Sequence, residues 1–225
     1  MIRRFGLLGI AAIFIFASGA FAQYTMDLTG VGDGVTFDGV YVSPYQGTIQ
    51  QGNTTIYTGY MICDDFTTES FLNSPWNATG TTAAAGNGKF AGDTYSFMGK
   101  TYNSQQMYDA VAYLATQLMI NPTGPLQTDL SFAMWDIMDQ SLNVYPDVAE
   151  TQTLITQAFA AGAVDAANVD VFTASPNNNV SQEFLVVNGP RVTTPEPSSA
   201  ALLGFDLASV VGLFFLLRRY RKVRA

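Results

Sequence analysis

The chain has one cysteine, Cys63, and no histidine among its 225 residues. Without histidine there is no Ser-His or Cys-His dyad, no histidine general base and no histidine-ligated zinc. A single cysteine forms neither an internal disulfide nor a four-cysteine metal site. The residue types therefore exclude most histidine-dependent catalysis, and we expect neither a metal nor a cofactor.

Two segments hold the residues that could still do chemistry: Tyr-Met-Ile-Cys-Asp-Asp-Phe at 60–66 and Leu-Ser-Phe-Ala-Met-Trp-Asp at 130–136. Together they resemble the thioester domains of bacterial surface adhesins. In that family a cysteine followed by an acid condenses with the glutamine of a helical Φ-Gln-x-x-Φ-Trp segment, which releases ammonia. Carried over by position, Cys63 matches the cysteine, while Leu130, Met134 and Trp135 match the helical segment. Ser131 stands where the family has its glutamine.

Ser131 decides what this resemblance implies, because a hydroxyl has no carboxamide that could condense with a thiol. Gln127 and Gln140 lie near the same helix but are out of register with the motif. The resemblance thus implies the fold without the bond, although Cys63 and Trp135 are equally typical of ordinary core residues. We expect Cys63 to be a free, buried thiol whose pKa is raised by the two acids that follow it.

The acidic residues do not form a catalytic pair in the sequence pattern. Asp64 and Asp65 are neighbours in a predicted strand, where adjacent side chains point to opposite faces. Asp136 and Asp139 share a predicted helix face in a stretch of sequence that has no Lys or Arg, and no D-x-D-x-D-G calcium loop is present. These patterns favour a protein without enzymatic activity.

The N-terminus predicts export. Residues 1–22 combine Arg3 and Arg4 with a short apolar run and the small residues Ala20 and Ala22. This order is typical of a secretory signal peptide that signal peptidase removes, leaving Gln23 as the first residue.

The C-terminus predicts a membrane anchor. Residues 198–217 are apolar apart from Asp206, long enough for a spanning helix, and the basic tail 218–225 holds their end in the cytoplasm. Pro195, Glu196 and Pro197 precede this helix, and Arg218, Arg219 and Arg221 follow it. This order resembles the PEP-CTERM sorting signal, which implies that an exosortase recognises the tripeptide and removes the tail.

The charge of the remaining chain is strongly acidic. Residues 23–197 carry three basic residues, Lys89, Lys100 and Arg191, against seventeen acids, which gives a net charge of −14. Such a surface repels phosphates, so we expect no nucleic-acid partner.

The periodicity of residues 23–190 predicts one ectodomain, followed by a linker over 191–197. Short strands are expected at 35–37, 40–42, 54–62, 169–173 and 182–187, with Asp38-Gly39 as a hairpin turn. A flexible loop, or edge strands around it, is expected over 77–99. Three helices are expected: one capped by Ser104 and ending at Asn121-Pro122, one over 128–138, and one with Pro146 at its first position that stops near Gly162.

These elements predict an α+β fold, with a β-rich, sandwich-like or barrel-like ectodomain, about three central helices and a C-terminal transmembrane helix. The ends predict a periplasmic ectodomain, anchored at the inner membrane before transfer to the cell surface or extracellular matrix. We expect a structural or adhesive role there. Two alternatives stay open: a module that binds exopolysaccharide through tyrosine and tryptophan, and a covalent adhesin that uses Cys63.

Overall fold

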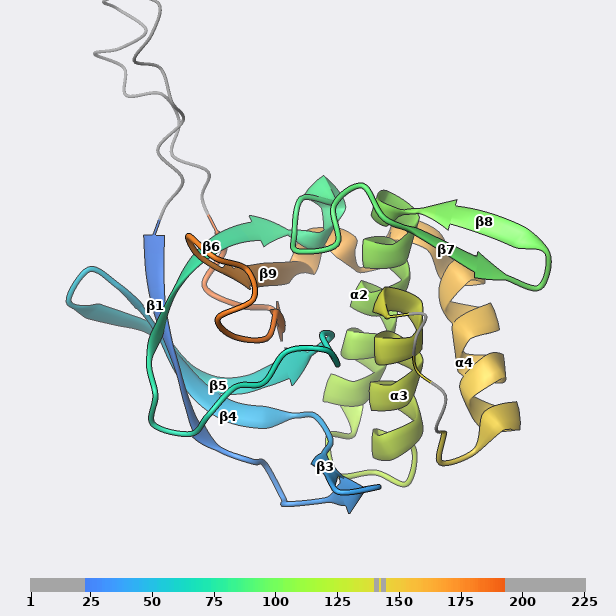
Figure 1. The fold of residues 1–225 in the computed structure, drawn as a ribbon, viewed down its shortest axis with the longest axis horizontal. Helices are drawn as coiled ribbons and strands as arrows, with labels where there is room; N and C mark the ends of the chain where they lie inside the picture. The colour runs from blue at the N-terminus through green and yellow to red at the C-terminus, as the bar shows by residue number, and fades with distance from the viewer. Residues whose placement is uncertain (1–22, 140–141, 143–144, 193–225) are drawn as a thin grey trace, which may run out of the picture. The chain divides into compact units, whose positions relative to one another are not determined.

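A closed barrel of six antiparallel strands forms one side of the domain in the computed structural model, which describes residues 23–139, 142 and 145–192 (Figure 1). Around the barrel the strands follow the order β1-β4-β5-β10-β9-β6. Their bounds are β1 Gln23–Gly30, β4 Tyr45–Gln51, β5 Thr54–Cys63, β6 Trp76–Thr82, β9 Val169–Ala174 and β10 Phe184–Val187. The α+β expectation is confirmed, and of its two β architectures the barrel is the one that forms.

The barrel interior is filled by side chains that alternate along the strands. In β1, Tyr24, Met26 and Leu28 are buried in one cluster. In β10, Phe184 belongs to that same cluster, whereas its neighbour Leu185 belongs to a second cluster shared with the helices. Because successive side chains of a strand point to opposite faces, β10 is buried on both of its faces. The helices therefore cover the outside of this part of the barrel.

A small hairpin confirms the turn predicted at Asp38-Gly39. It pairs β2 (Thr36–Phe37) with β3 (Val40–Tyr41). Asp38 and Gly39 have φ angles of 49° and 83°. A two-residue type I′ hairpin turn requires a positive φ at both central residues, and aspartate and glycine adopt this conformation at low cost.

The expectation of a flexible loop over residues 77–99 is wrong for most of this range, although residues 86–93 form neither a helix nor a strand. The first part of that range is β6, a strand of the barrel that pairs with β1 and β9. The small residues that suggest a loop instead permit close packing: a Cβ added at Gly80 would lie 2.9 Å from both the Tyr24 ring and the Val192 side chain. Farther along, β7 (Thr94–Phe97) and β8 (Lys100–Asn103) form a separate hairpin.

Three α-helices are present among the described residues, as the periodicity predicts. They are α2 (Ser104–Ile120), α3 (Gln127–Met138) and α4 (Val148–Ala161). The expected N-terminal residues of two of these helices are wrong. Asn103 rather than Ser104 caps α2, in a reciprocal capping box with Gln106. Asp147 caps α4, so Pro146 precedes the cap and is not the first helical residue.

Helix α3 contacts both hydrophobic clusters. Phe132 and Trp135 pack into the cluster of the barrel interior, whereas Ala133, Met134 and Ile137 pack with α2 and α4. A helix that is buried on most of its circumference belongs to the core. This position brings α3 to the end of β5 and to Cys63.

The predicted signal peptide over 1–22, the sorting signal at Pro195, Glu196 and Pro197, and the predicted membrane helix over 198–217 with its arginines lie outside the described residues. Among the helices that the structure does describe, none has both the length and the hydropathy needed to cross a membrane. Gln23, the residue after the predicted cleavage site, is the first residue of β1 and pairs with Thr79.

Candidate functional site

The structure brings Cys63 and Trp135 together, as the resemblance implies. Cys63 is the last residue of β5 and is completely buried. Its carbonyl oxygen accepts a hydrogen bond of 2.9 Å from the Trp135 indole N–H of α3. Its own N–H donates to the Ser43 hydroxyl at 2.9 Å, and its thiol donates to the Asp65 carbonyl at 3.1 Å. Every polar group of Cys63 therefore has a local partner.

Ser131 does not bond to Cys63. Its hydroxyl donates to the Gln127 carbonyl of the preceding helical turn, at 3.0 Å. The Gln127 carboxamide is also occupied, because its nitrogen donates to the Asp33 carboxylate at 2.9 Å and to the Ser43 carbonyl at 3.1 Å. Gln140 lies outside the described residues. Ser131 therefore has no carboxamide to offer the thiol, and the amide nitrogen of Gln127 is hydrogen-bonded to other groups.

The environment of Cys63 keeps the thiol protonated. Burial raises the pKa of the Cys63 thiol well above its ordinary value, and the carboxylates of Asp65 and Asp64 raise it further. The expected direction of this shift is confirmed, although burial rather than the neighbouring acids is the larger cause. A protonated, inaccessible thiol is a poor nucleophile.

Asp64 and Asp65 belong to a buried group of three carboxylates, which we call the carboxylate group, together with Glu183. All three are completely buried. Lys89 pairs with Asp65 at 2.6 Å, and its backbone N–H donates to Glu183 at 2.5 Å. The argument that the two aspartates point to opposite faces does not apply, since β5 ends at Cys63 and both follow it.

The donors within the carboxylate group are distributed unequally. Glu183 accepts hydrogen bonds from the hydroxyls of Tyr108 and Thr173, whereas neither carboxylate oxygen of Asp64 has a partner among the described residues. Burial, with the charges of Glu183 and Asp65, therefore raises the pKa of Asp64 well above its ordinary value. The geometry supports a protonated, structural Asp64.

No set of three or more cysteine, aspartate or glutamate side chains within the described ranges is arranged to hold a metal ion. In the carboxylate group, the lysine, tyrosine and threonine donors occupy the positions around Asp65 and Glu183 that a cation would otherwise fill. The direct interactions of this group are thus those of a buried polar network.

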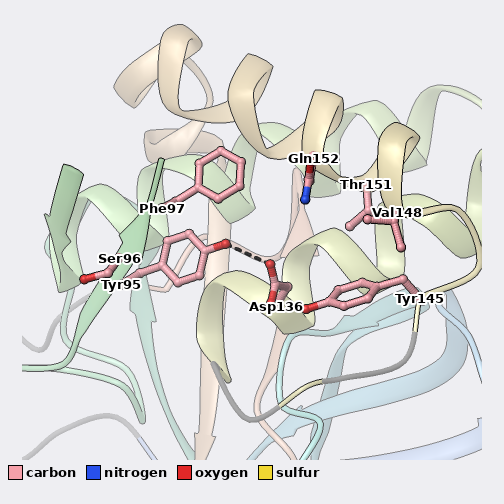
Figure 2. Close-up of a pocket in the computed structure, with 8 residues that line it drawn as sticks. All are labelled: Tyr95, Ser96, Phe97, Asp136, Tyr145, Val148, Thr151 and Gln152. Carbon is pink, nitrogen blue, oxygen red and sulfur yellow. Dashed lines mark hydrogen bonds between the residues drawn. The ribbon is translucent and has the colours of Figure 1, made fainter. Parts of the chain in front are cut away.

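A pocket lies where the β7–β8 hairpin meets α3 and α4, with a volume of about 280 Å³ (Figure 2). We call it the Asp136 pocket, after the carboxylate at its base. The Tyr95 hydroxyl donates to one Asp136 oxygen at 2.8 Å, and the Tyr145 hydroxyl donates to the other at 2.7 Å. Its walls include Phe97, Thr151 and Gln152.

The tyrosines of the Asp136 pocket remain hydrogen-bond donors at all ordinary pH values. Burial raises the pKa of Tyr95 and of Tyr145 above the ordinary tyrosine value, and the hydrogen bond to Asp136 raises both further. Sequence reasoning placed Asp136 on a helix surface and missed both tyrosines. The alternation of Tyr95 and Phe97 about Ser96 was the available signal of a hairpin strand.

No family model matches the chain, and no curated protein does either. The PEP-CTERM resemblance therefore depends on the quoted residues alone.

Among solved structures, the chain is similar to the N-terminal thioester domain of a surface protein from Clostridium perfringens, with 11% identity and a TM-score of 0.47 over 76% of this chain and 99% of that one. The thioester domain of fibronectin-binding protein SfbI from Streptococcus pyogenes has 11% identity and a TM-score of 0.39, over 77% and 94% of the two chains. The N-terminal domain of the Streptococcus pyogenes pilus tip adhesin Cpa has 11% identity and a TM-score of 0.41, over 75% and 94%. The chain thus has a distant structural resemblance to thioester domains of bacterial surface proteins.

Proposed function

We propose that this chain is an exported protein of the bacterial surface or extracellular matrix, with a structural or adhesive role and no catalytic activity. Signal peptidase removes residues 1–22, the helix over 198–217 holds the precursor in the inner membrane, and an exosortase releases it at the Pro-Glu-Pro segment. The observation that carries this proposal is the pairing of an export signal with a Pro-Glu-Pro, apolar-helix and arginine sequence at the two ends.

The ectodomain supports a non-catalytic role through the state of its most reactive groups. The Cys63 thiol is buried, hydrogen-bonded and held in its protonated form. The acids Asp65 and Glu183 are bound by donors of the same domain and are completely buried. Groups in these environments stabilise a fold more readily than they attack a substrate.

The covalent-adhesin alternative lacks support at the atoms it needs, because the hydroxyl of Ser131 and the carboxamide of Gln127 bond elsewhere. The alternative of carbohydrate binding keeps its tyrosines, of which Tyr41 is 47% exposed, but loses its tryptophans. Trp76 and Trp135 are 8% and 1% exposed, so neither presents a ring face on which a sugar could stack.

Replacement of Glu196 by Ala tests the sorting step. In cells that contain an exosortase, this variant should accumulate as a full-length, membrane-bound precursor, because the proposed protease reads the carboxylate between the two prolines. Cell fractionation and intact mass would follow the tail. Glu69→Ala is the matched control, since Glu69 is exposed and is distant from the signal in the sequence. Normal processing of Glu196→Ala would show that the carboxylate is not required, and a tail retained in the wild-type protein would contradict the proposed function.

A further inference from the structure

The Asp136 pocket combines a carboxylate with an excess of hydrogen-bond acceptors. An ionised carboxylate accepts about four hydrogen bonds, and within the described part of the chain two tyrosine hydroxyls supply two of them, with Tyr145 sharing its hydrogen with the Leu142 carbonyl. Each tyrosine oxygen keeps a lone pair after its own hydrogen is donated. A ligand rich in donors would therefore complement the base of this pocket.

The pocket also lacks a positive charge. Among the described residues that line it, none is basic. Of the three basic residues in 23–197, Lys89 is paired with Asp65, and Arg191 lies beside Asp170. Lys100 is exposed at the turn end of the β7–β8 hairpin, paired in register with Phe97. A partly buried carboxylate without a countercharge favours a cationic ligand.

A third observation concerns the wall formed by α4. Thr151 lines the pocket and is 1% exposed, yet its hydroxyl has no hydrogen-bond partner among the described residues. Most buried hydroxyls are satisfied, so an orphaned one beside a pocket indicates a missing partner. Gln152, one residue farther along α4, is exposed and lines the same pocket. Figure 2 shows Gln152 extending from α4 toward the space above Asp136.

The wall formed by β7 is aromatic. The half-buried Phe97 ring lines the pocket and packs in near-parallel fashion against Tyr95, at a centroid distance of 5.9 Å, whereas Tyr95 is itself 3% exposed and presents only its hydroxyl. A planar guanidinium is weakly hydrated and packs well against aromatic side chains, whereas an ammonium is a compact, strongly hydrated charge. The aromatic wall and the carboxylate at the base together favour the guanidinium.

We infer that the Asp136 pocket binds the guanidinium group of an arginine side chain from a partner polypeptide. The hydrogen bonds from Tyr95 and Tyr145 hold the carboxylate in position before the ligand arrives, which lowers the entropic cost of binding. The acidic ectodomain would also attract a basic partner before contact. This inference goes beyond the proposed export and sorting of the chain and does not depend on them.

Calorimetric titration of the full-length protein, in non-ionic detergent at low ionic strength, tests the inference. The probe is an acetyl-Gly-Arg-Gly-amide peptide, and its counterpart carries citrulline, which is isosteric with arginine but neutral. The arginine peptide should bind, and the citrulline peptide should bind about tenfold to a hundredfold more weakly, the range expected for hydrogen bonds to a charged group. Free arginine should bind more weakly than the peptide because its own carboxylate is repelled by Asp136.

Variants locate the site. Asp136→Asn should abolish the preference for arginine, while Asp93→Asn, which removes an equal charge at an exposed position, should leave it unchanged. Because Asp136→Asn also alters two hydrogen bonds, two substitutions of the exposed residue Gln152 provide a second test. Gln152→Glu should tighten binding of the arginine peptide, and Gln152→Arg should weaken it.

Four results would overturn the inference: no binding of the arginine peptide, equal binding of the citrulline peptide, tighter binding of free arginine, or binding that is insensitive to both Gln152 variants. Binding of neutral oligosaccharides in place of the arginine peptide would assign the pocket to sugars instead. Each of these results leaves the processing of the C-terminal tail unaffected, so failure here is distinguishable from failure of the proposed function.

Discussion

At the scale of single residues, burial decides what each reactive group can do. Cys63 is the strongest potential nucleophile of the chain, and Asp64 is an acid with two free oxygens, but both are completely buried. In both cases burial is the largest cause of a raised pKa. The neutral forms of these side chains are therefore the ones that the fold stabilises.

The first residue-scale prediction concerns the Cys63 thiol. The intact mass of the purified protein should equal the mass calculated for the residues it retains, without the loss of one ammonia at Cys63, because Ser131 has no carboxamide and the Gln127 amide nitrogen is bonded to Asp33 and Ser43. Methylamine should add nothing to the native protein. A thiol reagent should label Cys63 only after unfolding, and the label is unambiguous because the chain has one cysteine. A missing ammonia that peptide mapping locates at Cys63, or incorporation of methylamine at Gln127 or Gln140, would restore the covalent-adhesin alternative.

The second prediction concerns the ion pair between Lys89 and Asp65. Lys89→Met should lower the free energy of unfolding by about 3 kcal/mol, because it leaves a completely buried carboxylate without its countercharge. Urea unfolding followed by tryptophan fluorescence would measure the change. Lys100→Met is the matched control, since Lys100 is exposed, and it should change stability by less than about 0.5 kcal/mol. Equal effects of the two substitutions would show that the Lys89–Asp65 pair adds nothing.

At the scale of elements, the ends of the helices are determined by side chains that satisfy free backbone N–H groups. In α2 the Asn103 side chain accepts from the Gln106 N–H at 3.0 Å, and the Gln106 side chain accepts from the Asn103 N–H at 3.0 Å. In α4 the Asp147 carboxylate accepts from the N–H groups of Ala149 and Glu150. Serine is also a good capping residue, so type alone did not distinguish Ser104 from Asn103.

The capping box of α2 yields a prediction that separates these two neighbours. Asn103→Ala should lower the free energy of unfolding by about 1 kcal/mol, because the Gln106 N–H loses its acceptor. Ser104→Ala should have little effect or be slightly stabilising, because position 104 is already helical and alanine has the higher helix propensity. Thermal unfolding followed by far-UV circular dichroism compares the two. The reverse order of effects would place the cap at Ser104.

At the scale of the whole molecule, buried acid makes stability depend on pH. The pKa values of Asp64, Asp129, Asp170 and Glu183 are all raised, and burial is the largest cause at each. A raised pKa means that the folded chain binds more protons than the unfolded chain. The stability that these groups contribute is therefore fully present below their ordinary pKa values of 3.8 and 4.5. This contribution is lost as the pH rises from the ordinary pKa values through the raised pKa values. The excess of acids over bases adds repulsion in the same direction.

The corresponding prediction is that the protein is more stable at pH 5 than at pH 8. Between these values the free energy of unfolding should fall by about 1.4 kcal/mol per pH unit for each proton that only the folded form retains. Completely buried Asp64 should contribute most, since solvent screens the half-buried Asp129, and the backbone N–H groups of Arg191 and Val192 stabilise the charged form of buried Asp170. Asp64→Asn should flatten this dependence in urea titrations across the range. A variant with the same slope as the wild-type protein would show that Asp64 does not hold the proton.

The sequence by itself determined the features that arise from residue type and short-range periodicity. The helix expected at 128–138 forms over Gln127–Met138, and the Asp38-Gly39 turn forms because both residues tolerate a positive φ. The absence of histidine and the serine at position 131 restricted the chemistry before any fold was known. Helical periodicity and turn preference act over a few residues, and they can therefore be predicted from the sequence alone.

Only the tertiary structure decided which distant residues meet. Asp136 is 41 residues from Tyr95, and Asp65 is 118 residues from the Glu183 N–H that it binds. The strand β6 likewise packs closely against Tyr24 and Val192 at Gly80, and its own loop-like composition does not reveal these contacts. Each of these features depends on close packing between elements that are far apart in the chain, where local propensity has no influence.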